Sequence, residues 1–216
     1  MRLVFASNNA HKLAEVRAMM PAGVEVLSLK EIGFEQEIDE TGLTLEENSA
    51  IKAKAVAAFI SSQQSAVSRQ IDGVFADDTG LEIDALEGRP GVYTARWYRE
   101  DDAGTVLNDE MMIFKANRAK ALRELKGRAD RGCQFRTVIS LIRKPTPSHP
   151  EGKELIQVAG IVRGRIAESE YGEGGFGYDP IFIPEGYDKT FGELPAEVKN
   201  HISHRARAIE ELVKVL

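Results

Sequence analysis

The stretch "RLVFASNNAHKLAEVRAMM", residues 2–20, joins a short apolar run to a segment with helical periodicity through a small polar loop. The run "RLVFA" (2–6) is typical of a buried strand. Apolar residues then recur at helical spacing from Leu13 to Met20. A strand followed directly by a helix is the repeating unit of α/β proteins, so this stretch favours that fold class.

The rest of the chain continues the alternation of strand-like and helix-like segments. Thr44 and Glu47 form a capping-box pattern, which predicts that a helix begins there. "VFADD" (74–78) and "LEIDAL" (81–86) are predicted to be two strands separated by a turn at Thr79. The other expected elements are strands over 23–29, 133–144 and 153–168, helices over 105–125 and from Ser203 onward, and a surface loop over 61–73. We expect a single mixed α/β domain over residues 1–216.

Composition narrows the classes of function. The chain has 216 residues, of which 43% are hydrophobic and 29% charged, as is ordinary for a soluble globular protein. Its net charge of −6 argues against a protein that coats nucleic acid, because neutralising phosphates needs a surplus of Lys and Arg. No apolar run approaches the roughly 18 residues of a membrane span. The single cysteine, Cys133, cannot form an internal disulfide, which fits the cytoplasm.

The loop in "FASNNAHK" (5–12) is a candidate anion site. Free backbone N–H groups at a helix N-terminus attract anions, and Ser, Asn and Lys side chains add donors around them. The alternative interpretation is an ordinary strand-to-helix turn with Ser or Asn as the N-cap.

The two aspartates of "VFADDTG" (74–80) are the second candidate. Side chains of a strand alternate between its faces, so Asp77 and Asp78 cannot both face one pocket. We expect one to serve chemistry and the other to support it. Glu40 in "DETG" (39–42) supplies a further carboxylate, and two carboxylates plus substrate phosphates suit Mg²⁺. An Asp-rich turn is the alternative.

Two further segments offer aromatic rings and donors. "GEGGFGYDP" (172–180) surrounds Phe176 and Tyr178 with glycine, so that a ring could stack on a flat ligand; a flexible loop is the alternative. "EVKNHISHR" (197–205) places several hydrogen-bond donors within seven residues, and capping or packing is the alternative use of its histidine.

Taken together and in this order, the segments resemble the inosine triphosphate pyrophosphatase family, the dITP/XTP pyrophosphatases. The matching elements are "ASNNAHKLAEV", "ETGLTLEENSAIKAKA", "ADDTGLEIDALEGRPGVYTARW", "GGFGYDPIFIP" and "EVKNHISHRARAI". They cover nearly the whole chain. One departure is that many members have Thr-Gly-Asn where this chain has Ser7-Asn8-Asn9.

The resemblance implies an elongated, two-lobed α/β fold with a central mixed sheet flanked by helices and a substrate cleft between the lobes. It also implies a homodimer that uses Mg²⁺ to hydrolyse ITP, dITP or XTP to the monophosphate and pyrophosphate. Such an enzyme removes deaminated purines from the nucleotide pool, and neither a nucleic acid nor a membrane is expected as a partner.

The resemblance also implies roles for particular residues. Asp78 would be the catalytic base, and Glu40 and Asp78 would hold the metal. The residues expected to bind substrate are Ser7, Asn8, Asn9, Ala10, His11 and Lys12 around the triphosphate, Thr79 beside it, Phe176, Gly177, Tyr178 and Asp179 around base and sugar, and Lys199, His204 and Arg205 at the base edge.

Three other hypotheses remain open from the sequence. A related pyrophosphatase could prefer another base and differ only within residues 176–205. A nucleotide-binding regulator without turnover would have no need of Asp78 as a base. A nucleic-acid-binding module is disfavoured by the net charge.

Overall fold

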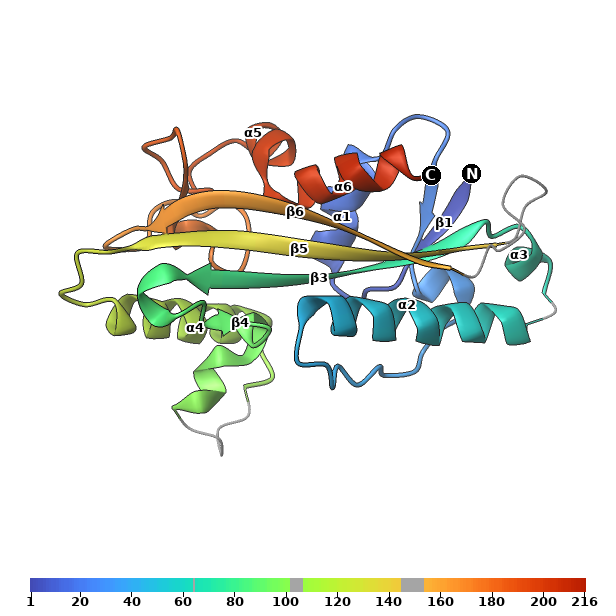
Figure 1. The fold of residues 1–216 in the computed structure, drawn as a ribbon, viewed down its shortest axis with the longest axis horizontal. Coiled ribbons are helices and arrows are strands. Elements are labelled where there is room, and N and C mark those ends of the chain that lie inside the picture. Colours follow the sequence, from blue (N-terminus) through green and yellow to red (C-terminus); the bar gives the residue numbers. More distant parts are fainter. Residues whose placement is uncertain (64, 102–106, 145–153) are drawn as a thin grey trace. The chain divides into compact units, whose positions relative to one another are not determined.

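The computed structural model describes residues 1–63, 65–101, 107–144 and 154–216, and Figure 1 shows its helices and strands. The strands are β1 (Arg2–Phe5), β2 (Glu25–Leu27), β3 (Gly73–Ile83), β4 (Pro90–Gly91), β5 (Gly132–Arg143), β6 (Leu155–Ile166) and β7 (Phe182–Pro184). The α-helices are α1 (Ala10–Met19), α2 (Leu45–Ser62), α3 (Ala66–Arg69), α4 (Glu110–Glu124), α5 (Ala196–Ile202) and α6 (His204–Lys214). Short 3₁₀ helices are η1 (Lys30–Ile32), η2 (Asp84–Leu86), η3 (Thr94–Glu100) and η4 (Asp179–Ile181).

The strands form one mixed sheet in the order β2-β1-β3-β5-β6-β7, with β4 beside β3. β1 pairs in parallel with β2 and β3, while the β3–β4 and β6–β7 pairs are antiparallel. The prediction of a mixed-sheet α/β fold is therefore confirmed.

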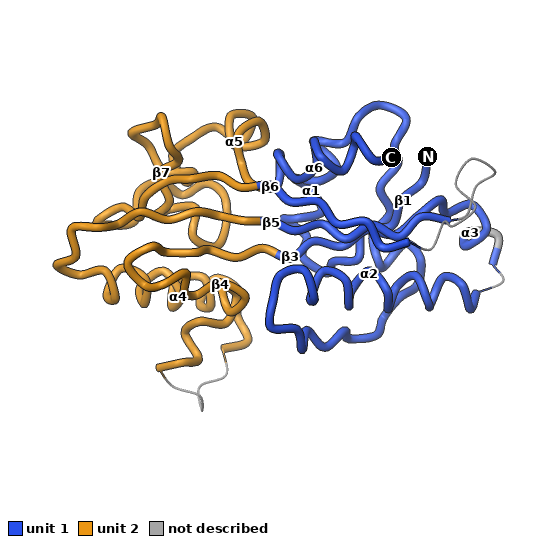
Figure 2. The backbone as a smooth tube through the Cα atoms, viewed as in Figure 1, with its two compact units in different colours: residues 1–78, 137–160, 205–216 blue, residues 79–136, 161–204 orange. Residues whose placement is uncertain are grey.

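The chain forms two compact units, coloured separately in Figure 2. Unit 1 contains residues 1–78, 137–160 and 205–216, and unit 2 contains residues 79–136 and 161–204. β3, β5 and β6 each contribute residues to both units. The chain thus passes repeatedly from one unit to the other, and the single domain over 1–216 stays a prediction.

In unit 1 the sheet is buried on both faces. Leu3 and Phe5 of β1 pack with α1 and α6, whereas Val4 of the same strand packs with α2. Figure 1 shows α1 and α6 on one face and α2 on the other. The alternation of side chains along β1 explains this division, because successive residues point to opposite faces.

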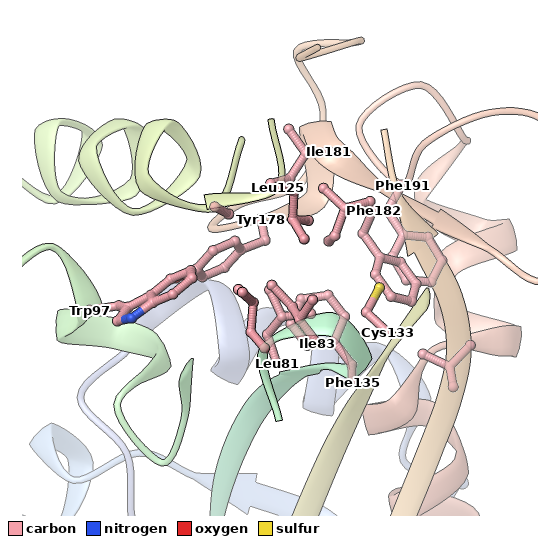
Figure 3. Packing of buried hydrophobic residues seen from close by; sticks show 14 residues of the cluster. Leu81, Ile83, Trp97, Leu125, Cys133, Phe135, Tyr178, Ile181, Phe182 and Phe191 are labelled. Carbon is pink, nitrogen blue, oxygen red and sulfur yellow. The ribbon is translucent and has the colours of Figure 1, made fainter. Parts of the chain in front are cut away.

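Unit 2 has its own apolar core, part of which appears in Figure 3. Leu81 and Ile83 of β3 lie in it with Phe135 of β5 and with the buried side chains of Trp97 and Cys133. Trp97 and Cys133 are fully buried core residues. Burial raises the pKa of the Cys133 thiol, so this cysteine is held in its neutral form.

Two predictions about local structure are wrong. Thr79 and Gly80 are not a turn, because β3 continues through them to Ile83. Gly80 is buried within the strand, and Thr79 before it is half-buried. Residues 61–73 are also not simply a loop, since α2 extends to Ser62 and α3 follows; Ser65 caps α3 by accepting from Ser68 N at 3.0 Å.

The capping box is confirmed, and so are the last two long strands, which are β5 and β6; residue 153 of the second predicted strand lies outside the described part of the chain. Thr44 and Glu47 exchange side-chain and backbone hydrogen bonds at the start of α2. The expected helix over 105–125 begins at Glu110, and residues 105 and 106 lie outside the described part of the chain.

Among the described residues, no helix combines the length and apolar character needed to cross a membrane.

Candidate functional site

Asp77 and Asp78 lie in the middle of β3, and their side chains contact different helices. Asp77 has the parity of Phe75, whose face of the sheet packs against α1 and α6. Asp78 has the parity of Val74, whose face packs against α2. The pleat therefore separates the two carboxylates, as the sequence predicts, even though Asp78 is not at a strand end.

Asp77 is 1% exposed and is the centre of a buried ion-pair network in unit 1. Lys12 Nζ of α1 donates to its Oδ1 at 3.0 Å. Arg205 of α6 donates to its Oδ2 from Nε at 3.3 Å and from Nη2 at 3.2 Å. The Nη1 group of Arg205 donates to Glu15 of α1. Asp77 thus ties two helices to the sheet.

The charges of this network shift the pKa values of its members. Burial by itself would raise the pKa of Asp77, but Lys12, Arg205 and Lys52 together lower that pKa well below its usual range. Burial lowers the pKa of Lys12, and Asp77 opposes this shift. Burial by itself would lower the pKa of Arg205, but Asp77 and Glu15 outweigh it and raise that pKa. Asp77 is consequently a fixed negative charge that balances two cations, and the supporting role expected for one aspartate of the pair stays a prediction.

Asp78 lies on the other face beside Lys52 of α2. Lys52 Nζ is 3.6 Å from Asp78 Oδ1 and donates to Glu40 Oε1 at 2.9 Å. The loop that carries Glu40 is attached to α2 by a hydrogen bond, in which the Gly42 N–H donates to Asn48 Oδ1 at 2.8 Å. A Cβ at Gly42 would lie 2.7 Å from that oxygen, so the loop needs glycine there. α2 therefore places Lys52 between the two carboxylates predicted to hold a metal.

The pKa of Asp78 is shifted in the opposite direction to that of Asp77. Burial raises the pKa of Asp78, Lys52 and Lys12 oppose the shift, and Glu40 and Asp77 add to it. Burial would lower the pKa of Lys52, but Asp78, Glu40 and Asp77 raise it. A carboxylate whose pKa is raised by its surroundings is suited to accept a proton. Within the described residues, no group of three or more His, Cys, Asp or Glu forms a metal site, so Glu40 and Asp78 are a pair only.

The predicted phosphate loop follows β1 directly. Asn9 is the N-cap of α1, and its Oδ1 accepts from Lys12 N at 2.9 Å. Ser7 Oγ accepts from Asn9 N at 3.3 Å. The other expected residues of the loop, Asn8, Ala10 and His11, are exposed. The N-cap interpretation is confirmed for Asn9, while phosphate binding stays a prediction.

In unit 2, Lys199, Asp179 and Phe176 form what we call the Lys199 cluster. Lys199 Nζ donates to Asp179 Oδ2 at 2.6 Å, and each of these residues is 4% exposed. The same oxygen accepts from Phe176 N at 2.7 Å. Lys199 Nζ also lies 4.6 Å from the centroid of the Phe176 ring, within the range of a cation–π interaction. The cluster thus joins α5 to the glycine-rich loop.

The backbone of the glycine-rich loop is fixed by close contacts. Gly175 has φ +71°, and a Cβ there would lie 2.1 Å from Asp179 Oδ2. Tyr178 is buried in the core, where its hydroxyl donates to Thr94 O at 3.0 Å (Figure 3). Burial raises the pKa of Tyr178, so the phenol remains neutral. The hypothesis of a flexible, unstructured loop does not fit these contacts.

The remaining predicted residues are divided between the units. His204 is buried, with its ring centroid 4.8 Å from that of Phe135. Thr79 is half-buried in β3, on the face of Asp77. Arg205 contacts Asp77 and Glu15, which favours a supporting role for its guanidinium; its expected role at the base edge stays a prediction.

Sequence reasoning missed Lys52 and Glu15. Lys52 lies with Asn48 and Ser49 on the buried face of α2 that also carries Val56. Polar residues at helical spacing within an apolar stripe were the available signal. Glu15 likewise shares one face of α1 with Lys12, at a spacing of three residues.

Comparison with known proteins identifies the family of this chain. The model of the Ham1 family matches residues 3–215. The chain is 44% identical to a dITP/XTP pyrophosphatase of Flavobacterium johnsoniae, covering 100% of this chain and 98% of that protein. It is also 44% identical to a dITP/XTP pyrophosphatase of Bacillus subtilis, covering 99% and 96%.

Solved structures with the same fold include two Ham1 proteins. The Staphylococcus aureus Ham1 protein matches with a TM-score of 0.74 and 37% identity, over 98% of this chain and 96% of that one. A HAM1 protein from Coxiella burnetii matches with a TM-score of 0.76 and 31% identity, over 100% and 98%. This chain therefore belongs to the Ham1 family.

Proposed function

We propose that this protein is a nucleoside triphosphate pyrophosphatase that hydrolyses ITP, dITP or XTP to the monophosphate and pyrophosphate. The observation that carries the proposal is the arrangement of Asp78 and Glu40 around Lys52, in a chain similar over its length to proteins named dITP/XTP pyrophosphatase. Removing deaminated purines from the nucleotide pool is the role that follows from such an activity.

The reaction needs a positioned water, a base and positive charge around the phosphates. Asp78, a buried carboxylate beside Lys52, accepts the proton of the attacking water. Lys12 and Lys52 neutralise charge on the phosphates, and the N-terminus of α1 donates backbone N–H groups to them. Asp77 holds Lys12 in place through its hydrogen bond.

Glu40 and Asp78 fit a hard divalent cation, which we propose to be Mg²⁺. Both are carboxylates, both lie within reach of one ammonium group, and Mg²⁺ typically uses one or two carboxylates together with substrate phosphates. When bound, the ion supplies positive charge where the phosphates carry negative charge.

In unit 2 the Lys199 cluster recognises the base. The Phe176 ring offers a stacking surface, and the Lys199 ammonium is a donor with no acceptor capacity. A 6-oxo purine presents an acceptor to such a donor, whereas the 6-amino group of adenine does not. That mismatch costs roughly 1–3 kcal/mol.

The assay that tests this proposal compares Mg²⁺-dependent hydrolysis of ITP, dITP, XTP, ATP and GTP, and separates pyrophosphate from orthophosphate. We expect pyrophosphate as the first product and faster turnover of ITP, dITP and XTP than of ATP. Equal rates on ATP and ITP would contradict the base preference, and orthophosphate as the first product would contradict the bond assignment. Binding of ITP without turnover would favour a regulator instead.

We also propose a cytoplasmic homodimer. The resemblance to the family supports the dimer, and the presence of only one cysteine supports a reducing compartment. Sedimentation of the purified chain tests the first point, and a monomer at micromolar concentration would contradict it.

A further inference from the structure

On α4 of unit 2, Phe114 and Arg118 are one turn apart, and both contact the glycine-rich loop. Arg118 Nη1 donates to the carbonyl oxygen of Gly177 at 2.9 Å. The centroid of the Phe114 ring is 6.2 Å from that of Phe176. Residues four apart lie on the same face of a helix, so α4 supports this loop with one continuous surface.

The contact of Arg118 with Gly177 is charge-assisted, and such hydrogen bonds are stronger than neutral ones. Gly177 has φ +61° and no side chain that could fix its position by packing. A neighbouring element can therefore hold Gly177, which lies between Phe176 and Tyr178, only through its backbone, and the Gly177 carbonyl oxygen is the group that Arg118 binds.

Arg118 is 8% exposed, so its charge needs partners inside the protein. Besides Gly177, its Nη2 group lies 2.9 Å from Glu170 Oε2. The sequence "YGEGGFGY" that follows Glu170 contains the loop itself, so both partners flank the segment that carries Phe176. Arg118 thus links Glu170, which precedes the glycine-rich loop, to Gly177 within it.

We propose that Arg118 is a positioning residue that sets the orientation of the Phe176 ring for stacking on the base. It acts through the Gly177 carbonyl and does not itself contact substrate. The inference rests on the proposed function, because it concerns the base side of that same site.

The test compares Arg118→Met and Arg118→Lys with Lys120→Met as a matched control. Lys120 is also buried on α4, and its ion pairs go to Glu100, Asp101 and Glu124 rather than to the loop. Both methionine variants remove a buried cation, so both will lower the melting temperature. Only the Arg118 variants alter the contact with Gly177.

For Arg118→Met we expect KM for ITP to rise about tenfold, the size of losing one hydrogen bond to a charged group, with little change in kcat. Arg118→Lys keeps the positive charge but lacks the planar set of guanidinium donors, so its KM will lie between that of the wild type and that of Arg118→Met. Lys120→Met will leave KM unchanged. An unchanged KM in Arg118→Met, or an equal rise in Lys120→Met, would overturn the inference. If Arg118→Met does not fold, a wild-type KM in Arg118→Lys would overturn it.

Hydrogen exchange separates this inference from the proposed function. Phe176 N–H donates to Asp179, so its exchange reports on loop order. Faster exchange over residues 172–180 in Arg118→Met but not in Lys120→Met supports the positioning role, and identical exchange refutes it. If the wild-type protein does not turn over ITP, the proposed function fails, and exchange alone decides the role of Arg118.

Discussion

In unit 1 the Asp77–Asp78 pair is held by side chains of three helices, whereas in unit 2 the Lys199 cluster is built around a loop. Lys12 and Glu15 come from α1, Lys52 from α2 and Arg205 from α6. Lys199 comes from α5, but Asp179 and Phe176 follow a run of glycines. The first cluster is a network of charged side chains on helices and a strand. The second is the single ion pair of Lys199 with Asp179, beside the Phe176 ring.

This difference matches the demands of the two proposed tasks. Electrostatic stabilisation of phosphates depends on charges that are already fixed before the reaction. Recognition of a base depends on a shaped surface, for which loops on a rigid support are commonly used. We therefore expect changes in unit 1 to affect turnover of every triphosphate, and changes in unit 2 to affect the choice among bases.

The largest expected effect is that of Asp78→Asn. Loss of the general base will lower kcat by about 10²–10⁴-fold, equally for ITP and ATP. Pyrophosphate release measured with both substrates checks this. The melting temperature is the control, and it will not fall, because the amide is neutral where burial disfavours the charge. Near-normal kcat would show that Asp78 is not the base.

The next effect is on stability and concerns Asp77. In Asp77→Asn the cations of Lys12 and Arg205 lose their shared counter-charge, and breaking a buried pair costs about 3–5 kcal/mol. Urea unfolding measures this loss. Glu25→Gln, which breaks the exposed pair with Arg2, is the control and will cost at most about 1 kcal/mol. Equal losses would mean that the buried network contributes no more than a surface pair.

The two aspartates will also have opposite effects on the pH dependence of stability. The pKa of Asp77 is lowered by folding, so the advantage of the wild type over Asp77→Asn is present above the ordinary aspartate pKa and is lost as the pH falls toward the lowered value. The pKa of Asp78 is raised, so the wild type is less stable than Asp78→Asn above that raised pKa and equal to it well below. As the pH falls, the Asp78 difference will shrink before the ordinary aspartate pKa of about 3.9 is reached, and the Asp77 difference only below it, with opposite signs. Differences of the same sign would contradict the contrast between the two faces of β3.

A smaller effect is expected from Lys199→Ala. Removing the donor will reduce the preference for ITP over ATP by about tenfold, the loss typical of one such hydrogen bond. The ratio of kcat/KM for the two substrates measures this, and hydrolysis of ATP itself will change less. A variant that loses ATP hydrolysis while keeping the ITP preference would reverse the roles given to the two units.

The sequence predicted the segments of these clusters better than it predicted their contacts. Alternation along β3 was enough to separate Asp77 from Asp78, because it depends only on the local geometry of a strand. The turn predicted at Thr79–Gly80 was wrong, because pairing within the sheet overrode a local turn signal. Local patterns also could not show that Arg205 contacts Asp77, since those residues are 128 positions apart.

The smallest effects will come from the caps of the two helices that support these clusters. Thr44 Oγ1 accepts from Glu47 N at 3.1 Å at the start of α2, and Asp109 Oδ1 accepts from Met112 N at 2.8 Å at the start of α4. Thr44→Ala and Asp109→Ala will each cost about 1 kcal/mol, measured by urea unfolding, and neither residue belongs to the proposed site.

The pair of caps also tests whether residues 1–216 are one domain. β3, β5 and β6 are shared by both units, so a cap lost from either helix will shift a single unfolding transition by the same amount. Two transitions, with Thr44→Ala shifting one and Asp109→Ala the other, would contradict the single domain. In that case the charge network and the base-recognition loop would belong to parts of the chain that unfold independently.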